Sequence, residues 1–248
     1  MNSEAALVRN DPSPASRQWR NAALPSWDRY KSLFLKGQGL SILRAMEYET
    51  IAHKILRGKT LDFGGGAKAK YKHLLKCEQY ESANIDPLIE PTWLMRVGGK
   101  LPCPDQTYDT VISLNTFEHI YDVPPVIRDI HRVMKSSGTF IFSVPFLYPV
   151  HGHPDDFCRY TASWWFQNLQ ESGFSEIIIT PHFWGPFTTG ATCSGVPGPF
   201  RKIRTHAALL MDLLYTRLRF GTETATFSGD AGKYLQNHAL GYFIEAKK

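Results

Sequence analysis

Residues 60–67, Thr-Leu-Asp-Phe-Gly-Gly-Gly-Ala, set three consecutive glycines directly after a short apolar run. Glycines at the end of a strand let the backbone turn tightly and approach a ligand closely. A helical pattern follows through Leu75, and the first turn of such a helix offers unpaired N–H groups. About twenty residues after the glycines, Asp86 ends a second apolar run, where a carboxylate can bind both hydroxyls of a ribose. This order of strand, glycine turn, helix and acid predicts a site for a nucleoside-bearing cofactor.

From Lys59 onward, short apolar runs alternate with helical patterns. Such alternation is typical of right-handed βαβ units. We therefore expect an α/β fold: a Rossmann-like, mostly parallel seven-stranded sheet with helices on both faces. Strands are predicted at residues 60–63, 82–85, 93–97, 110–114, 139–144, 177–180 and 240–246, and later helices at 123–134 and 162–172.

The remaining segments predict one domain with two additions. Residues 1–25 are polar and are interpreted as a loose leader, and residues 26–248 as a single domain. Helical patterns at 28–36 and 40–56 predict an N-terminal helical cap over residues 28–57. Residues 183–237 form an insertion before the last strand, with a helix at Arg201–Phe220. An apolar stripe on this helix comprises Ile203, Ala207, Leu210, Leu214 and Leu218. We expect this stripe to pack on its own domain, as a lid, or on a partner subunit. The basic residues at the helix ends would also allow binding to a membrane surface, which we do not favour.

Composition excludes several classes of protein. The chain has 248 residues, and its 43% hydrophobic and 21% charged residues exclude disorder as the main state. A net charge of +5 permits an anionic ligand but does not indicate nucleic-acid binding. The four cysteines form no CxxC pair, so we expect free thiols and a cytoplasmic protein without a signal peptide.

The glycine turn alone leaves the cofactor open. Gly64-x-Gly66-x-x-Ala69 fits a dinucleotide-binding pattern, which would suit an NAD(P)-dependent oxidoreductase. Asp62, two residues before the glycines, instead suits a cationic ligand with a free amine. A binding module without catalysis is a third alternative.

Five motifs in order resemble the class I S-adenosylmethionine (SAM)-dependent methyltransferases, in particular their small-molecule, type 11-like branch. The resemblance spans residues 59–173 and rests on Leu-Asp-Phe-Gly-Gly-Gly at 61–66, Ile-Asp at 85–86, the segment 101–109, Phe-Glu-His-Ile at 117–120 and the segment 132–138. It implies that SAM is the cofactor. Asp62 and the backbone of Gly64, Gly65 and Gly66 would hold the methionine part, and Asp86 the ribose. Leu101 would pack near the adenine, Leu114 and Asn115 would line the methionine side, and the Glu118–His119 pair would shape the pocket.

The loop after the fifth predicted strand, residues 149–161, is the densest cluster of reactive side chains. It resembles a signature of methyltransferases associated with surface polysaccharides, which implies O-methylation of a small molecule, such as a sugar or lipid-linked glycan. His153 could be the general base, Asp156 could orient it or share its role, and Arg159 and Tyr160 could bind the substrate. Alternatively, Asp156 and Arg159 pair to hold the loop. The histidines also fit a metal site, but we predict none.

Overall fold

The computed structural model describes residues 18–20, 23–35, 39–152, 155–195, 199–221 and 237–248. One eight-stranded sheet runs through the molecule in the order β1-β7-β8-β6-β5-β2-β3-β4. All neighbouring strands are parallel except β8, which is antiparallel to both β6 and β7. The strands are β1 Gln18–Trp19, β2 Ile55–Phe63, β3 Lys76–Asn84, β4 Trp93–Leu94, β5 Tyr108–Leu114, β6 Met134–Pro145, β7 Ser175–His182 and β8 Gly241–Lys247.

The predicted α/β class and mostly parallel sheet are confirmed, with one strand more than expected. The additional strand, β1, lies at the edge of the sheet and pairs through Gln18 and Trp19 with β7. It falls within the segment interpreted as a leader, of which residues 1–17 lie outside the described part of the chain. All four cysteines are free thiols.

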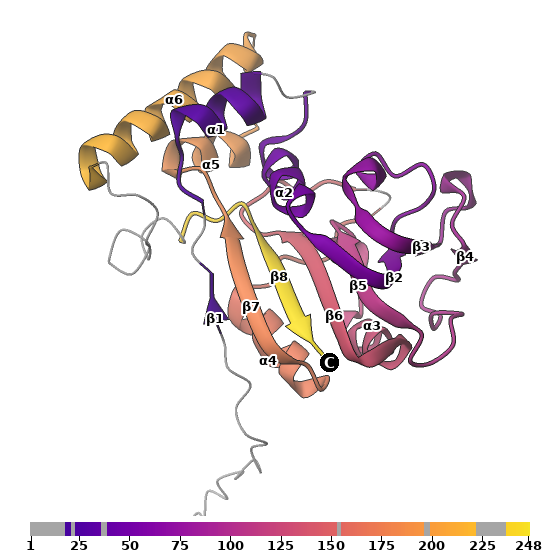
Figure 1. The fold of residues 1–248 in the computed structure, drawn as a ribbon. Coiled ribbons are helices and arrows are strands. Elements are labelled where there is room, and N and C mark those ends of the chain that lie inside the picture. The colour runs from indigo at the N-terminus through magenta and orange to yellow at the C-terminus, as the bar shows by residue number, and fades with distance from the viewer. Residues whose placement is uncertain (1–17, 21–22, 36–38, 153–154, 196–198, 222–236) are drawn as a thin grey trace, which may run out of the picture.

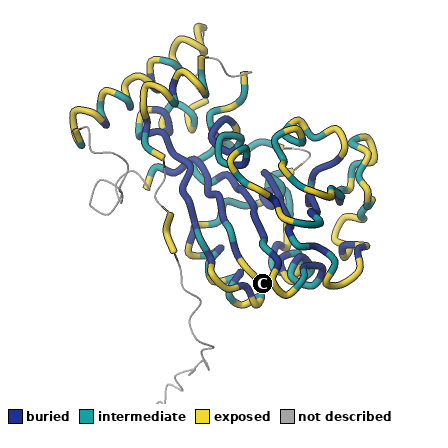
Figure 2. The backbone as a smooth tube through the Cα atoms, viewed as in Figure 1, coloured by how far each residue is buried: buried dark blue, intermediate teal, exposed yellow. Residues whose placement is uncertain are grey.

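Helices cover both faces of the sheet (Figure 1). The α-helices are α1 Trp27–Tyr30, α2 Ile42–Ala52, α3 Val123–Val133, α4 Ala162–Glu171, α5 Pro186–Cys193 and α6 Arg201–Phe220; a π-helical turn, η1 Lys31–Leu35, extends α1, and three short 3₁₀ turns are η2 Lys72–Leu74, η3 Pro87–Ile89 and η4 Phe117–His119. On one face, the apolar sides of α3 and α4 pack against β6, with Phe117, Phe142 and Trp165 in ring contact. On the other face, Ile51 of α2 packs with Ile112 and Phe243. The strands are mostly buried between these layers (Figure 2).

Two helices predicted within residues 40–75 do not form as expected. The helix predicted from the glycine turn through Leu75 is absent, and only η2 forms there. The backbone N–H groups of Ala67 and Lys68 donate to carbonyls of Glu90 and Ile89 instead of starting a helix. The helix predicted over 40–56 ends at Ala52, because β2 already begins at Ile55.

The described part of the insertion before the last strand, residues 183–195, 199–221 and 237, is largely helical. Helices α5 and α6 contact one another and lie with α1 beyond the carboxyl end of β7 (Figure 1). Tyr30 of α1 bonds His206 through its hydroxyl at 3.0 Å, and the indole of the buried Trp184 donates to the Leu209 carbonyl. Among the described residues, no helix has the length and apolarity needed to cross a bilayer.

The apolar stripe of α6 does not pack on its own domain. Ile203, Leu210, Leu214 and Leu218 are exposed, whereas the buried face carries Asp212 and Thr216. The Asp212 carboxylate accepts hydrogen bonds from the first backbone N–H groups of α5, at 3.0 Å from Phe187 and 2.7 Å from Thr188. The face of α6 that packs on its own domain therefore differs from the apolar stripe, because this packing is partly polar.

Candidate active site

The carboxyl ends of β2, β5 and β6 meet at one edge of the sheet. In parallel α/β sheets this is the edge at which ligands bind. Asp62 lies near the end of β2, Asn115 follows β5, and the loop that begins after β6 leads to His151. The predicted site residues of these three segments therefore lie at the same end of the fold.

Asp62 is fully buried and hydrogen-bonded by two tyrosines that the sequence did not single out. The hydroxyl of Tyr80 donates to Oδ2 at 2.7 Å, and that of Tyr71 donates at 3.0 and 3.1 Å to the two carboxylate oxygens. Burial raises the pKa of Asp62 to about 6, although these hydrogen bonds oppose the rise. Tyr80 reaches Asp62 because β2 and β3 pair in parallel, with Tyr80 beside Thr60 and Asp62 beside Ser82. Its position therefore depends on strand register rather than on a motif.

The three glycines are required by contacts within the protein. Gly64 has φ of +90°, a conformation that other residues rarely adopt. A Cβ at Gly65 would lie 1.9 Å from Asp62 Oδ2, and one at Gly66 would lie 2.4 Å from the Ile89 carbonyl oxygen. The turn therefore folds closely around Asp62 on one side and against η3 on the other.

Asp86 lies at the start of η3, just after β3. Its side chain accepts from the Leu88 N–H at 2.8 Å, and its own N–H donates to Asn84 Oδ1 at 2.9 Å. Leu101 is buried in the main core, and its N–H donates to Asp129 in α3. These two residues are thus held by local contacts that the sequence did not predict.

A cavity of about 120 Å³ opens beside Asn115, lined by Arg44, Tyr48, Lys70, Tyr71, Leu114 and Asn115. Leu114 and Asn115 were expected at the cofactor, whereas Arg44 and Tyr48 come from α2 and were missed. They are four residues apart on one helix, so they share a face. The Asn115 side-chain amide donates at 2.7 Å to Glu47, a buried residue of α2 whose other donor is the Ser143 hydroxyl. Burial raises the pKa of Glu47 to about 7.

The loop after β6 is held by an ion pair. Arg159 donates through both terminal nitrogens to the two carboxylate oxygens of Asp156, which also accepts the His151 N–H at 2.8 Å. Burial opposes ionisation of Asp156, but these bonds outweigh it and keep the pKa below its ordinary value. Tyr160 stacks on Trp164 at 3.5 Å between ring centroids. This geometry fits the alternative in which Asp156 and Arg159 hold the loop; His153 lies outside the described residues.

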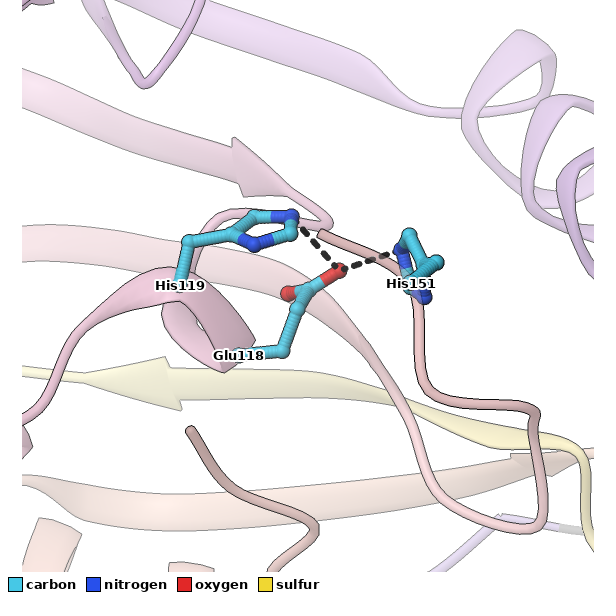
Figure 3. A group of neighbouring side chains, drawn as sticks. All are labelled: Glu118, His119 and His151. Carbon is cyan, nitrogen blue, oxygen red and sulfur yellow. Dashed lines mark ion pairs between the residues drawn. The ribbon is translucent and has the colours of Figure 1, made fainter. Parts of the chain in front are cut away.

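Glu118, His119 and His151 converge at the same edge (Figure 3). Glu118 Oε1 lies 3.7 Å from His119 Nε2 and 3.8 Å from His151 Nε2. Burial raises the pKa of Glu118 to about 8. The loop is joined to η4 by a hydrogen bond of 2.7 Å from the Phe157 N–H to the Glu118 carbonyl. The sequence signal for this group was present, since Glu-His follows one strand and His151 follows the neighbouring one.

Comparison with known proteins agrees with the fold. Residues 61–142 match the Methyltransf_11 family model, described as a methyltransferase domain. A SAM-dependent methyltransferase from Thermotoga maritima superposes with a TM-score of 0.51 at 12% identity, over 89% of this chain and 95% of that one. A SAM-dependent methyltransferase from Archaeoglobus fulgidus gives 0.48 at 14% identity, over 88% and 97% of the two chains. No curated protein matches the chain in sequence.

The structure thus has the Rossmann-like α/β fold of the Thermotoga maritima methyltransferase, and residues 61–142 match a methyltransferase domain.

Proposed function

We propose that this enzyme transfers the methyl group of SAM to a hydroxyl oxygen of a small-molecule acceptor, a sugar of a surface glycan. The observation that carries the proposal is the meeting of Asp62, Asn115 and the Glu118–His119–His151 group at one edge of the sheet. Cofactor residues and polar groups for an acceptor are then neighbours. The choice of a glycan acceptor rests on the resemblance of residues 153–161 to the polysaccharide-associated group.

In this proposal, SAM binds along the carboxyl ends of β2, β3 and β5. The Asp62 carboxylate faces the ammonium group, the backbone of residues 64–66 borders the methionine part, and Asp86 accepts from the ribose hydroxyls. Leu114 and Asn115 border the methionine side, and Leu101 packs near the adenine. Typical ligand pockets measure about 300–1,000 Å³. The cavity of about 120 Å³ beside Asn115 is smaller, so it would hold only part of SAM.

The reaction is an in-line displacement at the methyl carbon. The acceptor oxygen forms a bond to this carbon while the carbon–sulfur bond breaks, and the electron pair stays on sulfur. The enzyme must orient the acceptor and remove its proton. His153 stays our predicted base, with Arg159 and Tyr160 bordering the acceptor. Asp156 holds Arg159 and the His151 backbone, and its lowered pKa makes it a weak base.

Turnover to S-adenosylhomocysteine tests the proposal. The purified chain is incubated with SAM and with nucleotide sugars, lipid-linked glycans or phenols, and products are identified by mass spectrometry. We expect one O-methylated sugar product for each S-adenosylhomocysteine formed. His153→Ala should keep SAM affinity and lower kcat by about 10²–10⁴-fold. A methylated nitrogen or carbon atom, or a phenol product, would contradict the proposed acceptor.

A further inference from the structure

Glu118 is a buried carboxyl group without a hydrogen-bond partner in the described part of the chain. It is 2% exposed, and neither Oε1 nor Oε2 is within hydrogen-bond geometry of a donor. Buried polar groups are nearly always paired, because an unpaired one loses its hydration without compensation. The Nε2 atoms of His119 and His151 lie 3.7 and 3.8 Å from Oε1, too distant for hydrogen bonds. The described residues therefore supply no hydrogen-bond partner for the Glu118 carboxyl group, which leaves it free to bind a ligand.

The Nδ1 atom of each imidazole bonds elsewhere in the loop, which leaves Nε2 toward the carboxyl group. His119 Nδ1 lies 2.5 Å from the Asp155 carbonyl oxygen, and His151 Nδ1 lies 3.2 Å from the Pro149 carbonyl oxygen. A carbonyl oxygen only accepts, so Nδ1 of His119 carries the proton and its Nε2 keeps its lone pair. His151 Nδ1 also lies 3.4 Å from the Asp156 carboxylate, which only accepts, and 3.4 Å from a guanidinium nitrogen of Arg159, which only donates. Histidines that bind metals are typically oriented in this way by a second hydrogen bond. The rings are nearly perpendicular, at 85°, with centroids 5.4 Å apart.

We propose that Glu118, His119 and His151 bind one divalent first-row transition-metal ion. The three donor atoms all lie within 4.8 Å of one another, and one nitrogen of each imidazole is directed toward Glu118 Oε1 (Figure 3). Two imidazole nitrogens and one carboxylate oxygen suit ions such as Zn²⁺, Mn²⁺ or Co²⁺ better than Mg²⁺ or Ca²⁺, which prefer oxygen ligands. Ligands about 2.1 Å from a tetrahedral ion lie about 3.4 Å apart. Binding therefore requires the two Glu118–imidazole distances to shorten by a few tenths of an ångström, and donor atoms as far apart as 4.8 Å to approach by up to about 1.4 Å.

Three protein ligands leave at least one position open for another molecule. Such an open position is typical of metal ions that take part in catalysis. Resting on the proposed function, we assign this position to the acceptor hydroxyl. The ion would lower the hydroxyl pKa, so that the general base of the proposed function removes its proton more readily as the oxygen attacks the methyl carbon. The carbon–sulfur electron pair then leaves with sulfur, giving a methyl ether and neutral S-adenosylhomocysteine.

Metal titration without SAM tests the site. The full chain, free of any histidine tag and stripped with a chelator, is titrated with Co²⁺ and Mn²⁺ by calorimetry, and the visible absorption of Co²⁺ reports its ligands. We expect one ion per chain and affinity reduced at least tenfold in Glu118→Gln and in His151→Ala. His53→Ala, which removes an exposed histidine at the end of α2, should leave the affinity unchanged. Circular dichroism checks that each variant is folded. If Glu118→Gln does not fold, His151→Ala still tests the site, because it alters only a partly exposed side chain.

The outcomes separate this proposal from the proposed function. Absence of a bound ion, or equal affinity in wild type, Glu118→Gln and His151→Ala, would overturn the metal site, even if the enzyme methylates its acceptor. Specific binding that Glu118→Gln and His151→Ala abolish would support the site, even if no acceptor is methylated. In that case only the proposed function would fail.

Discussion

The hydroxyl of Tyr80 in β3 donates a hydrogen bond of 2.7 Å to the buried carboxylate of Asp62 in the neighbouring strand β2. Together with Tyr71, it gives a buried acid two uncharged donors, and no cation lies within ion-pairing distance of it among the described residues. The site is thus shaped for a cation but holds its carboxylate only with neutral groups. Stability and ligand binding should both depend on the protonation of Asp62.

The first prediction concerns pH. Burial raises the pKa of Asp62 from 3.8 to about 6, so the folded state holds this proton more tightly than the unfolded state. The resulting stabilisation is complete below about pH 4 and is lost as the pH rises through about 6. The difference in unfolding free energy between wild type and Asp62→Asn should therefore fall by as much as about 3 kcal/mol from pH 4 to pH 7. Urea unfolding at several pH values measures this difference.

The control for this experiment is Asp28→Asn, because Asp28 is an almost fully exposed acid, paired only with Lys31. Its difference from wild type should be nearly independent of pH. A difference for Asp62→Asn that is equally flat would contradict the raised pKa.

The second prediction concerns the ribose. Asp86→Ala should weaken SAM binding strongly, because each hydrogen bond to a charged acceptor is worth about 1.5–3 kcal/mol. Calorimetry measures the affinity. Asp86→Asn keeps an acceptor for the Leu88 N–H and separates this loss from unfolding of η3. Glu90→Gln, an exposed acid at the other end of η3, is the matched control and should bind SAM as the wild type does. Unchanged affinity in folded Asp86→Ala would remove Asp86 from the site.

The third prediction concerns the ion pair in the loop after β6. Removing one partner of a buried pair leaves an uncompensated charge, which costs about 3–5 kcal/mol. Arg159→Ala should therefore destabilise the fold by about 3 kcal/mol, and the double variant Asp156→Ala/Arg159→Ala should recover part of this loss. Denaturant unfolding measures both variants. If Arg159→Ala raises the KM for the acceptor while stability is unchanged, Arg159 binds substrate and does not hold the loop.

The fourth prediction contrasts the two faces of α6. Leu209 is 1% exposed and Leu214 is 59% exposed. Leu209→Ala should cost about 2–5 kcal/mol, because truncating a buried leucine leaves a cavity. Leu214→Ala should change stability by less than about 0.5 kcal/mol, as exposed substitutions do. Equal losses in thermal or urea unfolding would mean that the outward face of α6 is covered in solution.

The sequence predicted the sheet well, because apolar strand runs and glycine turns are local signals. Helix ends also carry local signals. Thr161 caps the first turn of α4, and Gly173, with φ of +93°, follows its last turn. The helix after the glycine turn failed because its N–H groups bond to residues 89 and 90, which are distant in sequence. No periodicity reports such a contact.

The site was predicted in part for the same reason. Asp62 stands in a motif, and Leu114 and Asn115 lie at the end of a predicted strand and line a cavity. Tyr80 and Glu47 reach the site through strand register and helix docking, which a single sequence does not encode locally. Glu118 and His151 converge because β5 and β6 are neighbours in the sheet. The sequence therefore identified both residues but not the contact between them.

The central claim is that the edge formed by β2, β3 and β5 binds SAM. Isothermal titration of the purified chain with SAM, S-adenosylhomocysteine and NAD tests it most directly. The account predicts one SAM or S-adenosylhomocysteine per chain, with no heat of binding for NAD. Binding of NAD in place of SAM, at affinity reduced by Asp86→Ala, would contradict the account and identify a dinucleotide site instead.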